Sequence, residues 1–315
     1  MPDNDILVVA TLPPFLMGAL RAGFTVHDRL NETDPVAFAA VAPRIRAVAA
    51  NGESKIGAAL MDRLPALKMI SVMGVGYDGI DVAAAKSRGA MVTHTPGVLN
   101  DDVADLAIGL MLATARAIPR ADRHVRAGLW PSGAMPLARK VSGARLGLVG
   151  MGRIGQAIAH RASAFAMSIA YTSRNAKAGL PYRYLPSVCA LAAESDFLIV
   201  ITPGGAGTRK LIDAEVLAAL GADGILVNVS RGSVVDEGAL IDALQRGVIA
   251  GAGLDVFEME PNVPQALRAL DQVVLTPHIG SATGATRRAM ADLAFANLHA
   301  FFMGRALISP VPECL

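Results

Sequence analysis

The chain has 315 residues, with 29 basic and 27 acidic side chains and a formal net charge of +2. This length is sufficient for two domains that each bury a core. The near-zero net charge provides no long-range field for polyanions, so neither nucleic acid nor a membrane surface is expected as a partner. The only cysteines, Cys189 and Cys314, argue against a disulfide framework and a thiolate zinc site, and no metal is predicted.

The N-terminal segment MPDNDILVVATLPPF has acidic residues where a secretory signal has lysines, and its apolar run is too short for export. The longest strongly apolar stretch of helical character, residues 106–115, is well below the roughly 20 residues of a membrane-spanning helix. These features predict a cytoplasmic protein.

Short aliphatic and β-branched runs alternate with helical patterns along the chain. Continuous apolar strands separated by helices are typical of parallel sheets that are covered on both faces, which predicts the α/β class. The predicted strands are residues 6–10, 45–50, 67–74, 90–95, 145–150, 167–173, 197–202, 224–230, 251–257 and 273–278.

Helix boundaries are indicated by capping residues and prolines. Ser54 is a candidate N-cap for a helix that ends near Pro65. A long helix is expected over residues 101–127, with a break at Pro119, and the last helix over residues 285–304.

Two domains follow from the position of the glycine-rich signature. It begins at Gly150, after about four strands of a different α/β unit. We therefore expect a first unit at residues 1–98, joined by residues 285–315, and a nucleotide-binding unit at residues 99–284.

The signature has the G-x-G-x-x-G spacing at Gly150, Gly152 and Gly155, between an apolar strand and an amphipathic helix. The first glycine permits a tight turn, the second permits backbone approach to a pyrophosphate, and the third permits close helix packing. The backbone N–H groups of Gly152, Arg153 and Ile154 are expected to face the pyrophosphate. A plain strand-to-helix turn is the alternative, which the flanking pattern disfavours.

The second strand of this unit ends in YTSRN, where an NAD-specific site places Asp or Glu. No acidic residue occurs between Asp122 and Glu194, and Ser173 and Arg174 occupy the position, with Lys177 nearby. A guanidinium binds phosphate bidentately, so the sequence predicts a site for the 2′-phosphate of NADP and a preference for NADPH over NADH. The alternative is that Arg174 is an ordinary surface arginine.

Three ionisable residues, Arg231, Glu260 and His278, lie at or just beyond the ends of predicted strands. In this fold the chemistry takes place at the carboxyl ends of the strands. Arg231 is suited to bind the carboxylate of a 2-oxo acid and polarise its carbonyl, His278 to donate a proton, and Glu260 to hold the imidazole. The other histidines are interpreted as structural hydrogen-bonding residues: His27, His94, His124, His160 and His299.

Five segments, in order and at matching spacings, make the chain resemble the D-isomer-specific 2-hydroxyacid dehydrogenases, in particular the glyoxylate/hydroxypyruvate and hydroxyphenylpyruvate reductase branch. The segments are MGVGYDGIDVAAAKSRGAMVTHTPGVLNDDVADLAIGLML, VGMGRIG, VNVSRGSVVDEGAL, GAGLDVFEMEP and LTPHIGSAT.

The resemblance implies two Rossmann-like, doubly wound parallel-sheet domains with the active site in the cleft between them, and a homodimer formed through the nucleotide domain. Arg231, Glu260 and His278 match the catalytic residues, and it is this match that selects Glu260 over Glu258. The resemblance further implies that the backbone amides of Val75 and Gly76 bind the substrate carboxylate, and that Thr202, Val229, Asp255 and Gly280 line the cofactor site. The segment TPGGAGTRKLI departs from the family pattern, so Thr202 is its one expected cofactor contact.

The sequence thus predicts NADPH-dependent reduction of small 2-oxo acids, glyoxylate and hydroxypyruvate foremost, to D-2-hydroxy acids. One alternative is a reductase of larger acids such as hydroxyphenylpyruvate or 2-ketogluconate. Another is a catalytically weak, nucleotide-sensing protein like the co-repressors of this superfamily. The sequence leaves open whether Trp130 or Met135 reaches a partner subunit's cleft.

Overall fold

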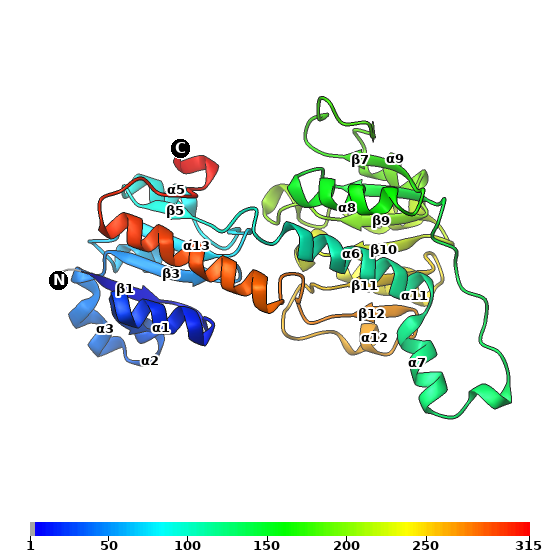
Figure 1. Ribbon diagram of the computed structural model, residues 1–315, viewed down its shortest axis with the longest axis horizontal. Coiled ribbons are helices and arrows are strands. Elements are labelled where there is room, and N and C mark those ends of the chain that lie inside the picture. The colour runs from blue at the N-terminus through cyan, green and yellow to red at the C-terminus, as the bar shows by residue number, and fades with distance from the viewer. Residues whose placement is uncertain (1–3) are drawn as a thin grey trace. The chain divides into compact units, whose positions relative to one another are not determined.

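The computed structural model describes residues 4–315 (Figure 1), and the first three residues of the N-terminal segment lie outside it. The chain divides into two compact units. Unit 1 comprises the chain up to Leu99 together with Thr283–Leu315, and unit 2 comprises Asn100–Ala282. Across residues 4–315, every helix is too short or too polar to cross a lipid bilayer.

Unit 1 contains a five-stranded parallel sheet in the order β2-β1-β3-β4-β5. Its last helix, α13, packs against β4 and α1. The strands are β1 (Asp5–Val8), β2 (Thr25–Asp28), β3 (Ala47–Asn51), β4 (Met69–Met73) and β5 (Met91–Thr93), and the helices are α1 (Pro14–Gly23), α2 (Leu30–Thr33), α3 (Pro35–Val41), α4 (Ala58–Asp62), α5 (Val82–Ser87) and α13 (Gly284–Phe302).

Unit 2 contains a seven-stranded parallel sheet in the order β12-β11-β10-β9-β6-β7-β8. The strands are β6 (Arg145–Val149), β7 (Ser168–Thr172), β8 (Arg183–Tyr184), β9 (Phe197–Val200), β10 (Ile225–Asn228), β11 (Gly251–Leu254) and β12 (Val273–Leu275). The helices are α6 (Asn100–Ala115), α7 (Ile118–Arg126), α8 (Arg153–Ser163), α9 (Val188–Ala193), α10 (Ala214–Leu220), α11 (Glu237–Gln245) and α12 (Gln265–Arg268).

The predicted α/β class with parallel sheets is confirmed in both units. All ten predicted strands form, whereas β2 and β8 were not predicted. Both lie at a sheet edge, and β2 is partly exposed and carries polar residues, so neither has the apolar pattern of an interior strand.

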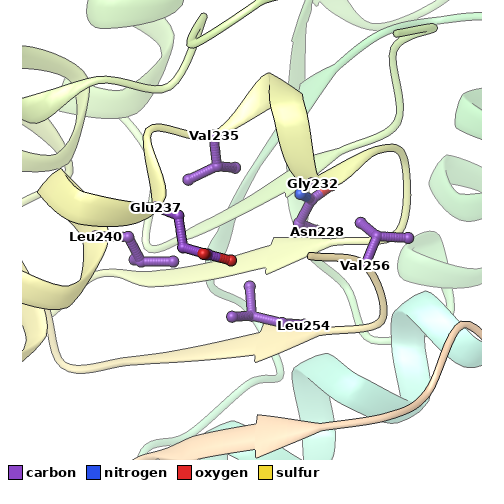
Figure 2. A pocket seen from close by; sticks show the side chains of 7 residues that line it. All are labelled: Asn228, Gly232, Val235, Glu237, Leu240, Leu254 and Val256. Atoms are coloured by element: carbon purple, nitrogen blue, oxygen red, sulfur yellow. The ribbon is translucent and has the colours of Figure 1, made fainter. Parts of the chain in front are cut away.

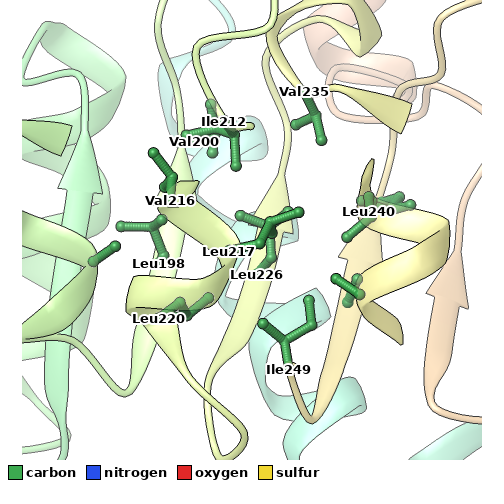
Figure 3. Close-up of a cluster of buried hydrophobic side chains, with 14 of the residues drawn as sticks. Leu198, Val200, Ile212, Val216, Leu217, Leu220, Leu226, Val235, Leu240 and Ile249 are labelled. Atoms are coloured by element: carbon green, nitrogen blue, oxygen red, sulfur yellow. The ribbon is translucent and has the colours of Figure 1, made fainter. Parts of the chain in front are cut away.

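The core of unit 2 explains the continuous apolar strands. Figure 3 shows Leu198 and Leu226, from β9 and β10, packed against Val216, Leu217 and Leu220 of α10. Burial of each such side chain contributes about 1.5–3 kcal/mol. This packing holds the strands whose carboxyl ends carry the residues described below.

Ser54 is not a helix cap. Its hydroxyl accepts the N–H of Asn51 at 3.1 Å and donates to Asn51 Oδ1 at 2.9 Å, which closes the turn after β3. Helix α4 begins later, at Ala58, with Gly57 as its N-cap and no side-chain cap.

The break in the long helix falls before Pro119. Helix α6 ends at Ala115, Ala117 has a left-handed φ of 49°, and α7 begins at Ile118. Pro119 therefore lies in the first turn of α7, where its missing N–H costs no helical hydrogen bond.

Candidate active site

The glycine-rich loop joins β6 to α8. Gly150 has a φ of 114°, and a Cβ there would lie 2.5 Å from the Ile201 carbonyl oxygen, while a Cβ at Gly155 would overlap the Gly150 carbonyl. At Gly152, the N-cap of α8, a Cβ would meet nothing within 4 Å, and no side chain caps the helix. Internal packing thus requires the first and third glycines, whereas the second faces open space. The first-turn N–H groups fit a pyrophosphate at this position.

The turn after β7 holds Arg174 in an exposed position. Tyr171 Oη accepts the N–H of Lys177 at 2.7 Å, and Tyr184 Oη donates to the Ser173 carbonyl at 3.3 Å. The Ser173 hydroxyl donates to a backbone carbonyl two residues later, at 2.6 Å. Arg174 is exposed and forms no ion pair or hydrogen bond within residues 4–315. The turn is therefore ordered by its tyrosines, and the guanidinium is available to an anion.

Arg231 is positioned by a buried asparagine. Asn228, at the end of β10, accepts from the Ser230 N–H at 3.0 Å and the Ser230 hydroxyl at 2.7 Å, and donates to the Arg231 carbonyl at 3.0 Å. A Cβ at Gly232 would overlap the backbone of Phe257. Because of that close approach, the turn with Arg231 lies against the loop that leads to Glu260.

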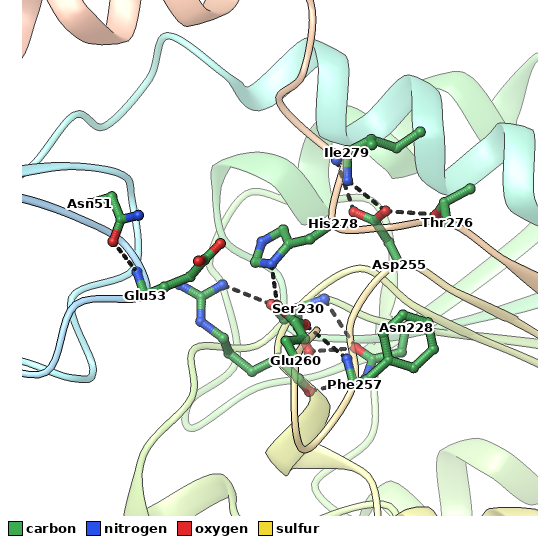
Figure 4. A network of polar contacts seen from close by, with 12 residues as sticks. Asn51, Glu53, Asn228, Ser230, Asp255, Phe257, Glu260, Thr276, His278 and Ile279 are labelled. Atoms are coloured by element: carbon green, nitrogen blue, oxygen red, sulfur yellow. Dashed lines mark hydrogen bonds and ion pairs between the residues drawn. The ribbon is translucent and has the colours of Figure 1, made fainter. Parts of the chain in front are cut away.

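Glu260 and His278 form a direct pair (Figure 4). Glu260 Oε2 lies 2.8 Å from His278 Nδ1, and Glu260 Oε1 accepts the N–H of Phe257 at 2.8 Å. A carboxylate accepts, so Nδ1 carries the hydrogen, and Nε2, the ring nitrogen that is not bonded to Glu260, is the one suited to exchange a proton. Glu258 instead pairs with Arg209 at 2.9 Å. The geometry thus distinguishes two glutamates that the sequence pattern alone did not.

Asp255 fixes the loop that presents His278. Its buried carboxylate accepts from the Thr276 hydroxyl at 2.7 Å and from the N–H groups of Ile279 and Gly280, each at 2.8 Å. Its backbone carbonyl accepts the N–H of His278, a residue with a left-handed φ of 53°. Burial raises the pKa of Asp255 despite these hydrogen bonds.

The electrostatics of the pair favour the charged imidazole. The hydrogen bond that the imidazole donates to Glu260 raises the pKa of His278 above its ordinary value, against the opposing effects of burial and Arg231. Burial alone would raise the pKa of Glu260, but the hydrogen bonds from His278 and the Phe257 N–H, together with the charges of His278 and Arg231, lower it below its ordinary value. The pair is therefore suited to hold a proton on the imidazole near neutral pH.

A pH profile tests this coupling. If protonated His278 is the proton donor, the rate of reduction falls as the pH rises through the pKa of His278, which lies above the usual value of about 6.5. In Glu260→Gln the carboxylate that raises this pKa is lost, so we expect the alkaline limb of kcat/KM to move to lower pH. An unchanged limb would contradict the role assigned to Glu260.

The residues singled out in unit 2 share one edge of its sheet, because each follows a strand and all the strands are parallel. The glycine loop follows β6, Ser173 and Arg174 follow β7, Thr202 follows β9, Val229 and Arg231 follow β10, Asp255 and Glu260 follow β11, and His278 and Gly280 follow β12. In the TPGGAGTRKLI loop, the Thr208 hydroxyl donates to the Pro203 carbonyl at 2.7 Å and closes a single turn, Ala206–Thr208. Val75 and Gly76 belong to unit 1 and follow β4.

Comparison with known proteins identifies the family. Residues 108–280, more than half of the chain, match the model of the NAD-binding domain of D-isomer-specific 2-hydroxyacid dehydrogenases. The chain belongs to the D-isomer-specific 2-hydroxyacid dehydrogenase family. It is therefore an oxidoreductase with a nucleotide-binding domain, as the resemblance implied.

Similar dehydrogenases cover nearly the whole chain. A glyoxylate/hydroxypyruvate reductase of Arabidopsis thaliana is 50% identical over 85% of each chain, and a hydroxyphenylpyruvate reductase of Plectranthus scutellarioides is 49% identical over 99% of this chain and 100% of the relative. The crystal structure of an NADPH-dependent glyoxylate/hydroxypyruvate reductase from Sinorhizobium meliloti, in complex with NADP and malonate, aligns with a TM-score of 0.94. It is 46% identical and covers 99% of this chain and 98% of that one.

Two residues that organise this dehydrogenase site, Asn228 and Gly232, were missed by sequence reasoning. Asn228 is 1% exposed in the structure. The sequence signal that could have identified it is its place as a polar residue at the end of an otherwise apolar strand. Gly232 gave no local signal, because the backbone it approaches, at Phe257, is distant in the sequence.

A small cavity lined in part by Asn228 and Gly232 contains the ionisable side chain of Glu237. Its volume is about 10 Å³, close to the smallest space that holds one water molecule, so it is too small for a substrate. Figure 2 shows Glu237 directed into the space near Leu240, Leu254 and Asn228. Glu237 Oε2 accepts the N–H of Glu258 at 3.3 Å. Burial raises the pKa of Glu237, and the charge of Glu258 adds to the effect.

Glu237→Gln is expected to stabilise the protein at neutral pH. The folded-state pKa lies above that of the unfolded chain, so ionisation of Glu237 lowers the free energy of unfolding as the pH rises through the folded-state pKa. Glutamine keeps the acceptor for the Glu258 N–H without the charge. We expect Tm to rise by about 1–3 °C at pH 7 and to be unchanged below about pH 4. Glu215→Gln, also in a first helical turn but exposed, is the control; an equal rise in that variant would contradict the assignment.

Proposed function

We propose that this dehydrogenase uses NADPH to reduce small 2-oxo acids to D-2-hydroxy acids, with glyoxylate and hydroxypyruvate as the leading substrates. The observation that carries the proposal is the His278–Glu260 pair, with Nδ1 and Oε2 2.8 Å apart. This pair follows strands of the same parallel sheet as a glycine loop that lacks its acidic partner.

In this mechanism each residue acts on a defined part of the substrate. The Arg231 guanidinium binds the carboxylate and polarises the adjacent carbonyl, and the backbone N–H groups of Val75 and Gly76 donate to the same carboxylate. His278 donates a proton from Nε2 to the carbonyl oxygen. Glu260 holds the ring through Nδ1 and stabilises the imidazolium. The bound nicotinamide supplies the hydride.

The cofactor site follows from the fit of the glycine loop to a pyrophosphate. Arg174 would bind the 2′-phosphate, since the exposed guanidinium has no protein partner within residues 4–315. Ser173 would join it by turning its hydroxyl from the backbone carbonyl of Asn175 to the phosphate. The NADPH-dependent relative from Sinorhizobium meliloti supports the same preference. The proposed cofactor-binding residues are Gly150, Gly152, Arg153, Ile154, Gly155, Ser173, Arg174, Thr202, Val229, Asp255 and Gly280.

The test is a direct assay. Purified protein mixed with NADPH and glyoxylate, hydroxypyruvate or hydroxyphenylpyruvate should lose absorbance at the nicotinamide band, fastest with one of the two smaller acids. Fastest turnover with hydroxyphenylpyruvate would favour the alternative of a reductase of larger acids, to which the Plectranthus relative points. Tight NADPH binding with no turnover on any acid would instead favour a nucleotide-sensing protein.

We further propose a homodimer formed through unit 2. Large apolar side chains are exposed on α7 and the segment that follows it, including Ile118, Val125, Leu129 and Trp130, and such a patch marks a contact surface. A single protomer mass in light scattering would contradict this proposal. The cytoplasmic location stays a prediction from the N-terminal sequence.

A further inference from the structure

A histidine of unit 1 holds the loop that carries Val75 and Gly76. His94 follows β5, and its Nδ1 lies 2.9 Å from the Val75 carbonyl oxygen. A carbonyl oxygen only accepts, so Nδ1 carries the hydrogen and donates it. The peptide bond between Val75 and Gly76 is trans, so the Gly76 N–H points away from that carbonyl. One hydrogen bond therefore sets the direction of the Gly76 N–H.

This loop presents two backbone donors, the N–H groups of Val75 and Gly76. Within residues 4–315, neither Val75 nor Gly76 donates its backbone N–H to a protein group. Both residues are only half-buried. Adjacent backbone N–H groups without protein partners are able to bind an anion such as a carboxylate.

The backbone of His94 is fixed by the C-terminal segment. The Ser309 carbonyl accepts the His94 N–H at 3.1 Å, and the Ser309 hydroxyl donates to the His94 carbonyl at 2.7 Å. Fully buried Asn297 of α13 donates to the Ser309 hydroxyl at 2.8 Å and accepts the N–H groups of Ile308 and Ser309. His94 is thus held from a part of the chain that is remote in sequence.

The ring of His94 and the loop are also restrained. Tyr77 packs edge-on against the ring, with centroids 5.3 Å apart at 86°, and its hydroxyl donates to Glu313 at 3.0 Å. On the other side of the loop, a Cβ at Gly74 would lie 3.0 Å from Gly52 Cα. Within residues 4–315, the hydrogen bond from His94 is the one made by the Val75–Gly76 peptide, so it sets the plane of that peptide.

We propose that His94 is a positioning residue for substrate binding: through the Val75–Gly76 peptide it aims the Gly76 N–H at the carboxylate of the 2-oxo acid. The inference rests on the proposed function. It differs from a purely structural role for His94, because loss of the side chain changes the affinity for substrate before it changes the fold.

The test compares three variants. His94→Ala removes the donor, and His94→Asn retains a side-chain N–H for the Val75 carbonyl. His27→Ala is the control, because His27 is also half-buried in unit 1 and bonds Asp5 Oδ1 at 2.7 Å. We expect the KM for glyoxylate to rise about ten-fold in His94→Ala, as for one lost hydrogen bond. The kcat and the KM for NADPH should stay near native, His94→Asn should recover most of the affinity, and His27→Ala should keep the native KM.

Three outcomes would overturn the inference: an unchanged glyoxylate KM in His94→Ala, a matching loss of NADPH affinity, or an equal rise in His27→Ala, which would indicate general destabilisation. Failure of the proposed function is a separate result. A native protein that turns over no 2-oxo acid would overturn that function and this role with it, whereas an active native enzyme whose KM is insensitive to His94 would overturn only the role of His94.

Discussion

Replacing His278 with alanine is expected to lower kcat for 2-oxo acid reduction by about 10³-fold or more while leaving NADPH binding nearly intact. The imidazole is the proposed proton donor, and loss of a positioned general acid costs typically 10²–10⁴-fold in rate. Its neighbour Glu260 raises the pKa of His278, which keeps the donor charged near neutral pH. Steady-state kinetics for turnover, with nicotinamide fluorescence for cofactor binding, separate the two properties.

The loop that carries His278 is expected to keep its structure in His278→Ala, so a loss of turnover can be distinguished from a loss of cofactor binding. Asp255 binds the backbone N–H groups of Ile279 and Gly280, so the loop keeps its anchors when the imidazole is removed. His299→Ala, at an exposed position near the end of α13, is the control and should retain native turnover. Equal loss of turnover and NADPH binding in His278→Ala would reassign His278 to a structural role.

Replacing Arg174 with alanine is expected to raise the KM for NADPH at least ten-fold, on the order of 1.4 kcal/mol, and to change the use of NADH little. The guanidinium is exposed at the turn after β7 and has no protein partner within residues 4–315. Its proposed partner, the 2′-phosphate, is present only in NADPH. Because the pair would be exposed, added salt should also weaken NADPH binding in the native protein.

The control for this prediction is Arg268→Ala, which removes an exposed arginine of α12 in the same unit. It should leave the KM for both cofactors unchanged. Two results would contradict the assignment of Arg174: a preference of the unmodified protein for NADH, or an equal effect of Arg174→Ala on the two cofactors.

Periodicity and composition were sufficient for much of the fold. The apolar runs of β6 and β9–β11 indicate interior parallel strands, which is confirmed, and the family membership follows from motifs at fixed spacings. Edge strand β2 was missed because it is partly exposed, so packing does not impose an apolar pattern on it. Ser54 was misassigned because a serine hydroxyl satisfies a turn as readily as a helix end.

The sequence by itself determined which chemical groups stand at the strand ends: a glycine loop, an arginine where an acid is usual, and an arginine, a glutamate and a histidine suited to reduction. These features depend on residue type and spacing, which are local. Only the tertiary structure decided their partners. It paired Glu260 with His278 and Glu258 with Arg209, made Asn228 the support of Arg231, and joined His94 to the Val75 carbonyl and to Ser309. Hydrogen bonds act over about 3 Å, and the pKa of a group depends on its burial and neighbours, so both are set by which distant segments the fold brings together.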